Sequence, residues 1–473
     1  MKVFYPTNVK LTQTRTLKSR EILNSLVNDP KLSQIVGDMS KLTDAYVEWA
    51  NYNLKTDPNY TRPGARALKI PPTLKITKIA DIDSFPLMTL DIPVRCDGDY
   101  TQHLLSVVGF RSEYETPGGV NLPKVTFVLC SDGVTRKQLV KGNDDMRQDS
   151  VMEQVFSVAN QLLSKRQPTQ HLSMRTYKVQ PLSQRSGLVE WCENTMPIGV
   201  YLVGRGRDGA HAKYRPRDTK SSDIRAILKA CRDKNHANLP MEYKLQCEKF
   251  KPVFRHYFTE NFANPAEWYR QKCNYTYSLA TSSIVGHIVG LGDRHVQNIL
   301  IDKATSELIH IDLGVAFDQF NTLKHTQGQL LHIPEKVPFR LTRDLVDGLG
   351  ISGTEGVFRR SCEHVMRVLQ ENKELLIAII EVFIHDPLFN WCTNDTTTET
   401  KQQKEQEPLK SDEDTAKQIN NQAQRVLGSL KRKLEGIEEG VVLGVEGQIN
   451  HLIRKAQDPA NLSRIFVGWQ AWI

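Results

Sequence analysis

The sequence has few cysteines, and none of them stand at the spacing of a metal or redox motif. Its eight cysteines among 473 residues are scattered without a single C-x-x-C pair. This absence disfavours a zinc module and a disulfide framework, and it favours a reducing compartment, the cytosol or the nucleus. A small stapled scaffold is also excluded, because a chain of this length can bury cores in two or three packed units.

Long apolar segments are missing as well. The first ten residues contain no apolar stretch typical of a secretory leader, and the strongest apolar run, residues 375–384, is short and interrupted by Glu381. We therefore expect neither a signal peptide nor a membrane-spanning helix.

Neither sign of charge dominates. The chain has 62 Lys and Arg against 54 Asp and Glu, a net charge of +8, and 39% of its residues are hydrophobic. That composition is typical of a globular protein. A surplus of this size is compatible with a nucleotide, nucleic acid or acidic lipid partner, but it is also common on proteins that merely stay soluble.

The spacing of apolar residues predicts a β-rich unit followed by a helical one. Helical periodicity covers residues 20–56, returns at Val151 and dominates the second half of the chain. This order predicts an α+β fold of two lobes with a cleft between them. The expected strands are 87–90, 104–110, 125–130 and 134–140, the last two joined by a Ser131-Asp132-Gly133 turn, and the clearest later helices are 275–289 and 357–384.

A polar stretch then separates this body from the tail. Residues 394–424 are rich in Thr, Gln, Lys, Glu and Asp and have almost no large apolar side chain. Such a segment cannot offset its ordering entropy by burial, so we expect a flexible linker. A helix containing Val426 and Leu430 follows, and a compact tail covers residues 441–473.

The strongest chemical signal is Gly290-Leu291-Gly292-Asp293-Arg294-His295-Val296-Gln297-Asn298, followed by an expected hairpin and Asp312-Leu313-Gly314. Phosphoryl transfer from a magnesium-bound nucleotide needs an acid that orients the attacking hydroxyl and oxygen ligands for the metal. Asp293, Asn298 and Asp312 supply that set. The interval from Asp293 to Asn298 equals that of the H-R-D-x-x-x-x-N loop, and Asp312 begins the counterpart of D-F-G.

Two other interpretations apply to these residues. The loop 293–298 or the triplet 312–314 alone would be interpreted as turn-capping residues or a simple turn. Their order and spacing together make that interpretation improbable. A zinc or iron site built from His295, His310 and Asp312 is the second alternative. It explains Asn298 poorly, because amide and carboxylate oxygens suit magnesium better than a transition metal.

A kinase also needs a cation on the nucleotide phosphates and an acid that holds this cation. Lys141 ends the second strand of the expected hairpin, and Asp149 falls in the first turn of the next helix, after Asp144 and Asp145. We expect an ion pair between Lys141 and Asp149. The alternative is a surface lysine beside carboxylates that favour a helix start in any case.

Two further patterns are weaker. Residues 204–209 match G-x-G-x-x-G, but we expect no helix after them and interpret them as a basic loop rather than a nucleotide fingerprint. Trp469 and Trp472 could enter a membrane interface, although a packed anchor at the end of the tail is the favoured interpretation.

Taken together, the motifs at 139–142, 145–149, 292–298 and 312–314 resemble the phosphatidylinositol-3-kinase-related protein kinases, whose catalytic loop has Asp-Arg-His where ordinary protein kinases have His-Arg-Asp. The tail 461–473 resembles the FATC domain that closes these proteins. The stretches 118–124, 181–187 and 281–286 narrow the resemblance to one branch of the family. The likeness covers about residue 40 to the end, except for the linker. Residues before about 60 resemble the last helices of the FAT region, which implies the C-terminal part of a far larger protein or a short isoform.

The resemblance implies a role for each site residue. Lys141 would contact the ATP phosphates, Asp149 would position Lys141, and Asp144 would lie in the same nucleotide site. Asp293 would orient the substrate hydroxyl and His295 would stabilise charge on the transferred phosphoryl group. The remaining residues would be the tip of the phosphate loop (Ser131, Asp132, Gly133), the hinge beside adenine (Glu190, Trp191, Cys192) and the magnesium ligands (Asn298, Asp312), with manganese as a possible substitute.

The resemblance also implies a domain plan and an activity. The expected function is a nuclear serine/threonine protein kinase of the double-strand-break response, with a possible cytoplasmic pool, that phosphorylates Ser or Thr followed by Gln in checkpoint signalling, repair and telomere maintenance. Its expected partners are a DNA-break sensor adaptor and, in the full-length protein, a second copy. The domains would be a FAT-like helical end (1–65), an N-lobe (66–190), a C-lobe (191–392) with catalytic loop 290–298 and activation segment 312–340, a linker with a regulatory helix (393–440), and FATC (441–473).

Three alternatives to this function remain at this point. A phosphoinositide kinase shares the catalytic core, but residues 315–335 hold only Lys324 as a full positive charge for a polyanionic headgroup. The second alternative is an inactive kinase-fold scaffold, although no expected catalytic residue is missing. The third is direct DNA binding by residues 205–220.

The activation segment departs from the family pattern. It looks longer than usual between Phe320 and Ile333, which makes the Ser-Gln preference less secure than the ATP chemistry.

Overall fold

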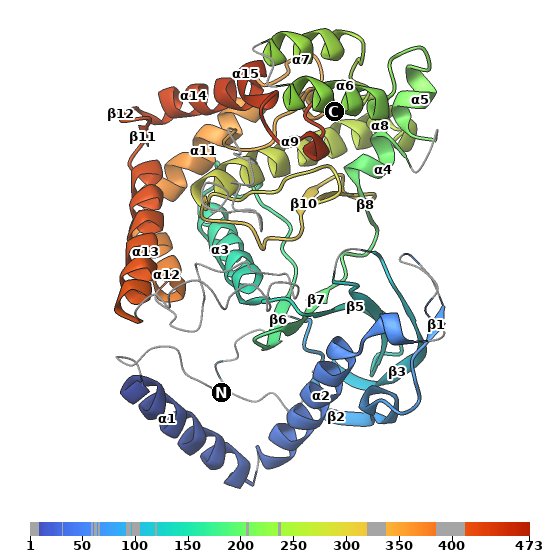
Figure 1. Ribbon diagram of the computed structural model, residues 1–473, viewed down its shortest axis with the longest axis vertical. Helices are drawn as coiled ribbons and strands as arrows, with labels where there is room; N and C mark the ends of the chain where they lie inside the picture. Colours follow the sequence, from blue (N-terminus) through green and yellow to red (C-terminus); the bar gives the residue numbers. More distant parts are fainter. Residues whose placement is uncertain are drawn as a thin grey trace. The chain divides into compact units, whose positions relative to one another are not determined.

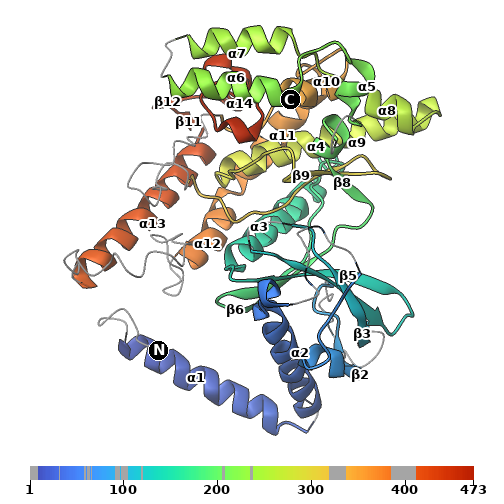
Figure 2. The ribbon, with the colours of Figure 1, turned by 45° about the vertical axis from the view of Figure 1, so that its right-hand side comes forward.

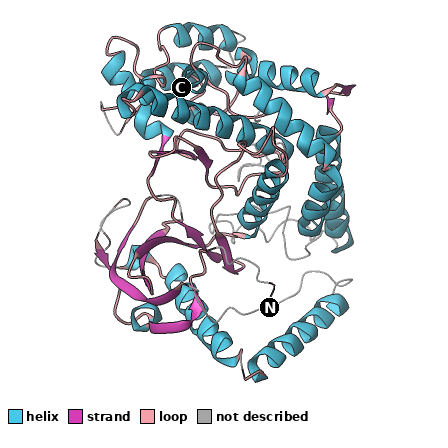
Figure 3. Ribbon diagram, turned by 180° about the vertical axis from the view of Figure 1, so that it is seen from behind, coloured by secondary structure: helices cyan, strands magenta, loops and turns pink. Residues whose placement is uncertain are grey.

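The computed structural model describes residues 9–30, 32–57, 60, 64, 67–90, 96, 105–118, 121–204, 208–234, 238–318, 337–384 and 412–473. These residues form two compact units. The first comprises Met1–Glu153, Tyr177–Glu193 and Lys410–Ala416, and the second comprises Gln154–Thr176, Asn194–Leu409 and Lys417–Ile473. Most strands belong to the first unit, whereas the second is mainly helical (Figure 3).

The first unit is built on an antiparallel seven-stranded sheet. Its order is β1-β3-β4-β5-β7-β6, with β2 paired to β3. The predicted hairpin is confirmed, because β4 and β5 pair from Lys124 with Val140 to Leu129 with Thr135. The elements of this unit are α1 (Val9–Asn28), α2 (Ser33–Asn51), the 3₁₀ turns Leu54–Thr56 and Lys75–Lys78, β1 (Leu68–Lys69), β2 (Ala80–Pro86), β3 (Ser106–Glu115), β4 (Lys124–Cys130), β5 (Thr135–Gly142), β6 (Val179–Ser183), β7 (Ser186–Glu190) and the start of α3 (Arg147–Ser164).

Helix α2 covers one face of this sheet (Figure 1). Its buried Trp49 donates from Nε1 to Thr126 Oγ1 at 3.0 Å, and Lys124 Nζ donates to the Ala50 carbonyl at 2.9 Å. Helix and sheet approach so closely that a Cβ on Gly142 would lie 2.2 Å from the Ala50 carbonyl oxygen. This packing fixes the end of β5, and therefore the backbone around Lys141.

The second unit is organised around the long buried helix α9, with α11 at its side (Figures 1 and 2). A small antiparallel sheet, in the order β10-β9-β8, lies beside it. The elements of this unit are the rest of α3, β8 (Thr195–Pro197), α4 (Ile198–Leu202), α5 (Ala210–Tyr214), α6 (Ser221–Asp233), α7 (Leu239–Glu248), α8 (His256–Asn261), α9 (Pro265–Ile288), β9 (Ile299–Asp302), β10 (Leu308–His310), α10 (Arg343–Leu349), α11 (Val357–Glu371), α12 (Lys373–Ile384), α13 (Asp412–Leu434), β11 (Ile437–Glu438), β12 (Val441–Val442), α14 (Val445–Gln457), α15 (Pro459–Leu462) and the 3₁₀ turn Val467–Trp469.

Three local predictions were wrong. Residues 87–90 form a turn and not a strand; Leu87 is buried there, so its burial produced the apolar signal. Helix α13 begins at Asp412, so residues 412–424 are helical and not part of a linker, while 394–411 lie outside the described residues. A one-turn helix, α5, does begin at Ala210, directly after the glycine-rich stretch 204–209.

Two further findings apply to the described residues alone. Among the described residues, no helix is both long and apolar enough to cross a membrane. The seven cysteines that can be described are all free thiols.

Candidate active site

The β9-β10 hairpin brings together the two halves of the predicted catalytic motif. Ile299 pairs with His310, and the Ile311 amide donates to the Asn298 carbonyl at 3.0 Å. Asn298 at the end of the loop therefore lies beside the strand that leads into Asp312, although the two residues are far apart in sequence. All of these residues belong to the second unit.

A buried arginine fixes this arrangement. The guanidinium of Arg294, which is 2% exposed, donates to the carbonyls of Gly292 (2.6 Å), Ile311 (2.9 Å) and Asp312 (2.6 Å). A guanidinium has several donors in one plane, so it can bind both chain segments at once. Arg294 thus holds the backbone of Asp312 next to the loop that carries Asp293.

The side chains of Asp293 and Asn298 meet across the loop. Asn298 Nδ2 donates to the Asp293 carbonyl at 3.1 Å and lies 3.4 Å from Asp293 Oδ2. Asp293 and Asp312 both have left-handed backbones, with φ of 55° and 60°. Such conformations are costly for residues other than glycine and are frequent at functional sites. The loop therefore presents the Asp293 carboxylate, which is 42% exposed, to solvent.

His295 lies beside this carboxylate. Its Nδ1 accepts the Gln297 amide at 3.2 Å, so the proton of the neutral imidazole is on Nε2, which faces Asp293 Oδ2 at 3.9 Å. Burial, together with the nearby charges of Arg294 and Arg340, lowers the pKa of His295, although the Asp293 charge opposes this shift. The lowered pKa favours the neutral ring, in which the Nε2–H of His295 is a hydrogen-bond donor.

The donor set suits a hard divalent cation better than zinc or iron. Because the Asn298 amide nitrogen is directed to Asp293, its side-chain oxygen could serve as a metal ligand, and the Asp312 carboxylate could supply further oxygens. No group of three or more His, Cys, Asp or Glu side chains is placed to hold a metal ion within the described part of the chain. The alternative site built on His295, His310 and Asp312 is thus not favoured by the structure.

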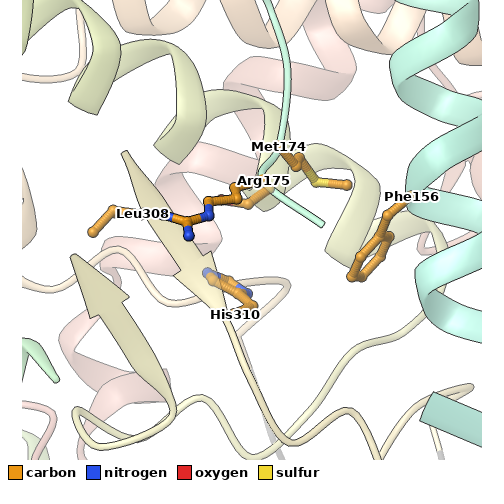
Figure 4. A pocket seen from close by; sticks show the side chains of 6 residues that line it. Phe156, Met174, Arg175, Leu308 and His310 are labelled. Atoms are coloured by element: carbon orange, nitrogen blue, oxygen red, sulfur yellow. The ribbon is translucent and has the colours of Figure 1, made fainter. Parts of the chain in front are cut away.

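His310 instead lines a small pocket together with residues of α3, α9 and the segment after α3 (Figure 4). Both ring nitrogens are buried, and neither has a hydrogen-bond partner among the described residues. Burial, with the nearby Arg294 charge, lowers its pKa to about 3. Apolar side chains make up much of the lining of this pocket, which is formed by Phe156, Met174, Arg175, Ser282, Leu308 and His310.

In the first unit, Lys141 is the second-to-last residue of β5, the strand that precedes helix α3. Its Nζ is 3.5 Å from Asp144 Oδ2, and only 16% of the lysine side chain is exposed. Asp149 lies in the first turn of α3, as the sequence predicts, and the structure shows that it is buried. The Asp144 contact was not anticipated as an ion pair; the pairing of Lys141 with Asp149 stays a prediction.

The Ser131–Gly133 turn joins β4 and β5 and has a defined shape. Ser131 Oγ accepts the Ser106 amide at 3.0 Å, and Gly133 has a φ of +78°. Asp132 accepts two hydrogen bonds from the Arg136 guanidinium, at 2.9 and 2.7 Å. This bidentate contact lowers the pKa of Asp132 to about 2. Asp132 is therefore a charge-paired turn residue, so any phosphate contact here would come from Ser131 or the backbone.

The predicted hinge residues lie at the end of the first unit. Glu190 is on the last position of β7, where its carboxylate accepts the Lys178 amide at 2.9 Å. The Lys137 ammonium lies 5.7 Å from the centre of the Trp191 ring, and Cys192 is partly buried. The chain passes into the second unit just after these residues, between Glu193 and Asn194.

Sequence reasoning missed the roles of two arginines. Arg294 stands inside the motif, but only the fold shows that it binds the segment around Asp312. Arg340 is 2% exposed and donates to the carbonyls of Arg294 (3.1 Å), Trp469 (2.7 Å), Gln470 (3.1 Å) and Ile473 (3.0 Å). Arg340 therefore connects loop 290–298 to the tail of the chain, a contact that no sequence motif signals.

One protein family matches the part of the chain that holds both parts of the candidate site. This part includes Lys141 as well as Asp293, Asn298 and Asp312. The family model for phosphatidylinositol 3- and 4-kinase matches residues 137–393, more than half of the chain, and the FATC domain model matches residues 442–473. The chain belongs to the phosphatidylinositol 3- and 4-kinase family, and the predicted FATC resemblance is confirmed.

Individual relatives narrow the likeness to ATM and Tel1 kinases. The chain is 43% identical to "Serine-protein kinase ATM" of Sus scrofa over 98% of its own length, and 38% identical to "Serine/threonine-protein kinase tel1" of Schizosaccharomyces pombe over 96%. It spans only 15% and 16% of those two proteins. The solved "Complete CtTel1 dimer with C2 symmetry" is 35% identical, with a TM-score of 0.81 over 99% of this chain and 16% of that one. These matches confirm the predicted α+β kinase-like fold, and they identify the ATM and Tel1 kinases as the branch of the family that the chain resembles.

Proposed function

We propose that this chain is the catalytic part of an ATP-dependent serine/threonine protein kinase of the DNA-damage response. The observation that carries the proposal is the loop 290–298, which Arg294 binds to the backbone of Asp312. This contact brings an exposed acid, an amide and a second acid into one neighbourhood. The similarity to ATM and tel1 kinases supports the same reaction and protein substrates.

Each proposed site residue of the second unit would have a role that its geometry allows. The Asp293 carboxylate, turned to solvent and contacted by Asn298 Nδ2, would accept a hydrogen bond from the substrate hydroxyl and orient it for attack. The Nε2–H of His295 would donate to an oxygen of the transferred phosphoryl group, where negative charge develops. Asn298 and Asp312 would hold a magnesium ion, or manganese in its place.

The bound cation would neutralise charge on the phosphates of ATP. The first unit would supply Lys141 as the phosphate-binding cation, with Asp144 and Asp149 keeping it in place. The turn Ser131-Asp132-Gly133 would cover the phosphates, and Glu190, Trp191 and Cys192 would contact adenine. The Asp132 carboxylate is already paired with Arg136, which reduces its repulsion of an anion.

Substrate choice, partners and location follow the same relatives. We propose Ser or Thr followed by Gln as the phosphorylated site, and roles in checkpoint signalling, repair and telomere maintenance in the nucleus. A DNA-break sensor adaptor would recruit the protein. A Tel1 structure similar to this chain is a dimer with C2 symmetry, which supports a homodimer for the full-length protein.

A direct experiment offers the purified chain ATP and Mg²⁺ with a Ser-Gln peptide, the matching Ser-Ala peptide, and phosphatidylinositol vesicles. We expect transfer to the Ser-Gln peptide alone. Turnover of lipid alone would favour the phosphoinositide kinase, and no turnover of either would favour the inactive scaffold.

Two variants show whether the observed turnover belongs to this site. Asp312→Ala is expected to abolish transfer while the protein stays folded, because a metal ligand is lost. Asp223→Ala removes a carboxylate from the exposed face of helix α6 and serves as the matched control. Unchanged turnover in Asp312→Ala would contradict the metal role of that residue.

A further inference from the structure

A lysine of α13 connects two backbone segments next to the candidate active site. Lys433 Nζ lies 2.9 and 3.0 Å from the two carboxylate oxygens of Asp318, and it donates to the His287 carbonyl at the end of α9 at 2.9 Å. These contacts use all three donors of the ammonium group. Ser429, one turn earlier on α13, donates to Asp318 Oδ2 at 2.9 Å. The lysine side chain is only 14% exposed.

Asp318 belongs to a short stretch of backbone that pairs with the stem of the catalytic loop. Residues 315–318 follow Asp312-Leu313-Gly314, and residues 289–292 precede Asp293. Gly290 allows the close approach, because a Cβ at this position would lie 2.5 Å from the Asp318 amide nitrogen. The pairing consists of Gly292 N to Val315 O (2.9 Å), Phe317 N to Val289 O (2.8 Å) and Asp318 N to Gly290 O (3.2 Å).

The end of α13 that carries Lys433 is itself anchored in a buried polar network. Gln448 Nε2 donates to the Lys433 carbonyl at 2.8 Å and to Glu438 Oε1 at 2.9 Å. The same Glu438 oxygen lies 3.0 Å from His287 Nε2, and Gln370 donates to Gln448 Oε1 at 2.9 Å. Gln448 belongs to the part of the chain that matches the FATC domain, so that domain fixes the position of the lysine.

We propose that Lys433 is a positioning residue for phosphoryl transfer: by holding Asp318 and the His287 carbonyl together, it keeps the backbone after Asp312 in register with the stem of the Asp293 loop. Lys433 contacts none of the proposed catalytic or metal-binding side chains, so it acts through Asp318. Ser429 strengthens the hold on Asp318 by donating a further hydrogen bond to the same carboxylate. The effect on catalysis rests on the proposed function. The clamp itself, defined as Lys433, Ser429, Asp318 and the His287 carbonyl, does not.

Two features explain why an external contact is needed here. Phe317 and Asp318 have φ of 58° and 55°, a conformation that persists only when the surroundings hold it. Burial alone would raise the pKa of Asp318, but the Lys433 ammonium and the Ser429 hydroxyl more than offset burial and leave the pKa below its ordinary value. Loss of Lys433 would therefore leave a charged, half-buried carboxylate without its counter-ion.

The test compares variants of the whole chain by kinase rate and by hydrogen exchange of residues 287–318. Lys433→Met is expected to lower kcat at least about tenfold, with the KM for ATP changed less than about threefold, because small misplacements affect the transition state most. Adding Asp318→Asn should recover part of the rate, since no charge is then left unpaired. Lys431→Met, two residues away and exposed, is the matched control. Lys433→Arg should retain most of the activity because it keeps the charge.

Hydrogen exchange separates this proposal from the proposed function. Faster exchange of residues 289–292 and 315–318 in Lys433→Met, but not in Lys431→Met, is the expected result. If that is seen in a chain that phosphorylates no peptide, the clamp stands and only the proposed function fails. Unchanged exchange would overturn the clamp in any case. A kcat within about twofold of the parent in an active chain would overturn the positioning role. If Lys433→Met does not fold, Ser429→Ala provides the milder form of both comparisons.

Discussion

At the scale of single residues, the candidate site depends on acids that the motif reveals and on arginines that it does not. Asp293 is the acid with the most direct proposed role, and its carboxylate is 42% exposed. Asp293→Ala should therefore leave the fold intact while kcat falls by roughly two to four orders of magnitude, the usual contribution of an acid or base. Steady-state rates on a Ser-Gln peptide and thermal unfolding of the same samples test both parts. A fall of less than about threefold would count against the role.

The acids were predictable because their spacing is local. Asp293 and Asn298 share one loop, and the order of loop, hairpin and Asp312 was enough to group them. Arg294 and Arg340 were not predictable, since both bind backbone carbonyls that are distant in sequence. A carbonyl acceptor carries no residue-type signal, so only the fold shows which segments an arginine joins.

His287 gives the second residue-scale prediction, a pH dependence of stability. The ring is buried beside Glu438, and the other charged groups facing it are Lys433 and Asp318. Burial lowers the pKa of His287, in spite of its hydrogen bond to Glu438. Above its ordinary pKa of 6.5, the folded and unfolded states are both neutral at this residue and no stability is lost. As the pH falls through 6.5, the unfolded state takes up a proton that the folded state resists, so stability decreases.

The slope is at most about 1.4 kcal/mol per pH unit. His287→Gln keeps an amide donor for Glu438 but does not titrate, so it should remove this contribution between pH 7 and the folded pKa. Urea unfolding at a series of pH values measures it. His171→Gln, at an exposed histidine, is the control. Parallel curves for the parent and His287→Gln would show that this residue contributes nothing.

At the scale of elements, periodicity predicted types better than boundaries. The β4-β5 hairpin, α3, α9 and α11 agree with their patterns. Residues 87–90 misled because a buried turn can be as apolar as a strand. Residues 412–424 were wrongly predicted as a linker because the first half of α13 is strongly polar. The second half of the helix provides the packing, through the buried side chains of Val426, Leu427, Leu430 and Leu434. Tertiary contacts, which single-sequence patterns do not contain, decided both cases.

The tail provides the element-scale prediction. Trp472 is 1% exposed and donates from Nε1 to Ser221 Oγ on helix α6 at 3.0 Å, so the predicted packed anchor is confirmed. Trp472→Ala should destabilise the protein by about 3–5 kcal/mol, as expected for loss of a fully buried tryptophan. Phe466→Ala, at a side chain that is 47% exposed in the same tail, should cost far less. Chemical denaturation measures both, and equal losses would show that the anchor is not specific.

At the scale of the whole molecule, net charge turned out to be a weak guide to function. The +8 surplus suggested an anionic partner, yet the residues proposed to meet ATP are mainly one lysine and several acids that act through a cation. The surplus instead includes exposed cations such as Arg215, Arg217 and Lys220, beside α5 and α6. Their exposure, and the Asp218 partner of Arg215, are typical of a solvated surface.

This distribution predicts weak, salt-dependent contact with DNA rather than a dedicated DNA site. If those three cations contact phosphates, the slope of log affinity against log salt is about −2.7, and affinity falls about 40-fold between 50 and 200 mM salt. Fluorescence anisotropy with a duplex measures the slope, and replacing the three residues with glutamine should flatten it without changing the rate on a Ser-Gln peptide. Tight binding that is independent of salt would instead place a functional DNA contact on this surface and weaken the case for recruitment by an adaptor.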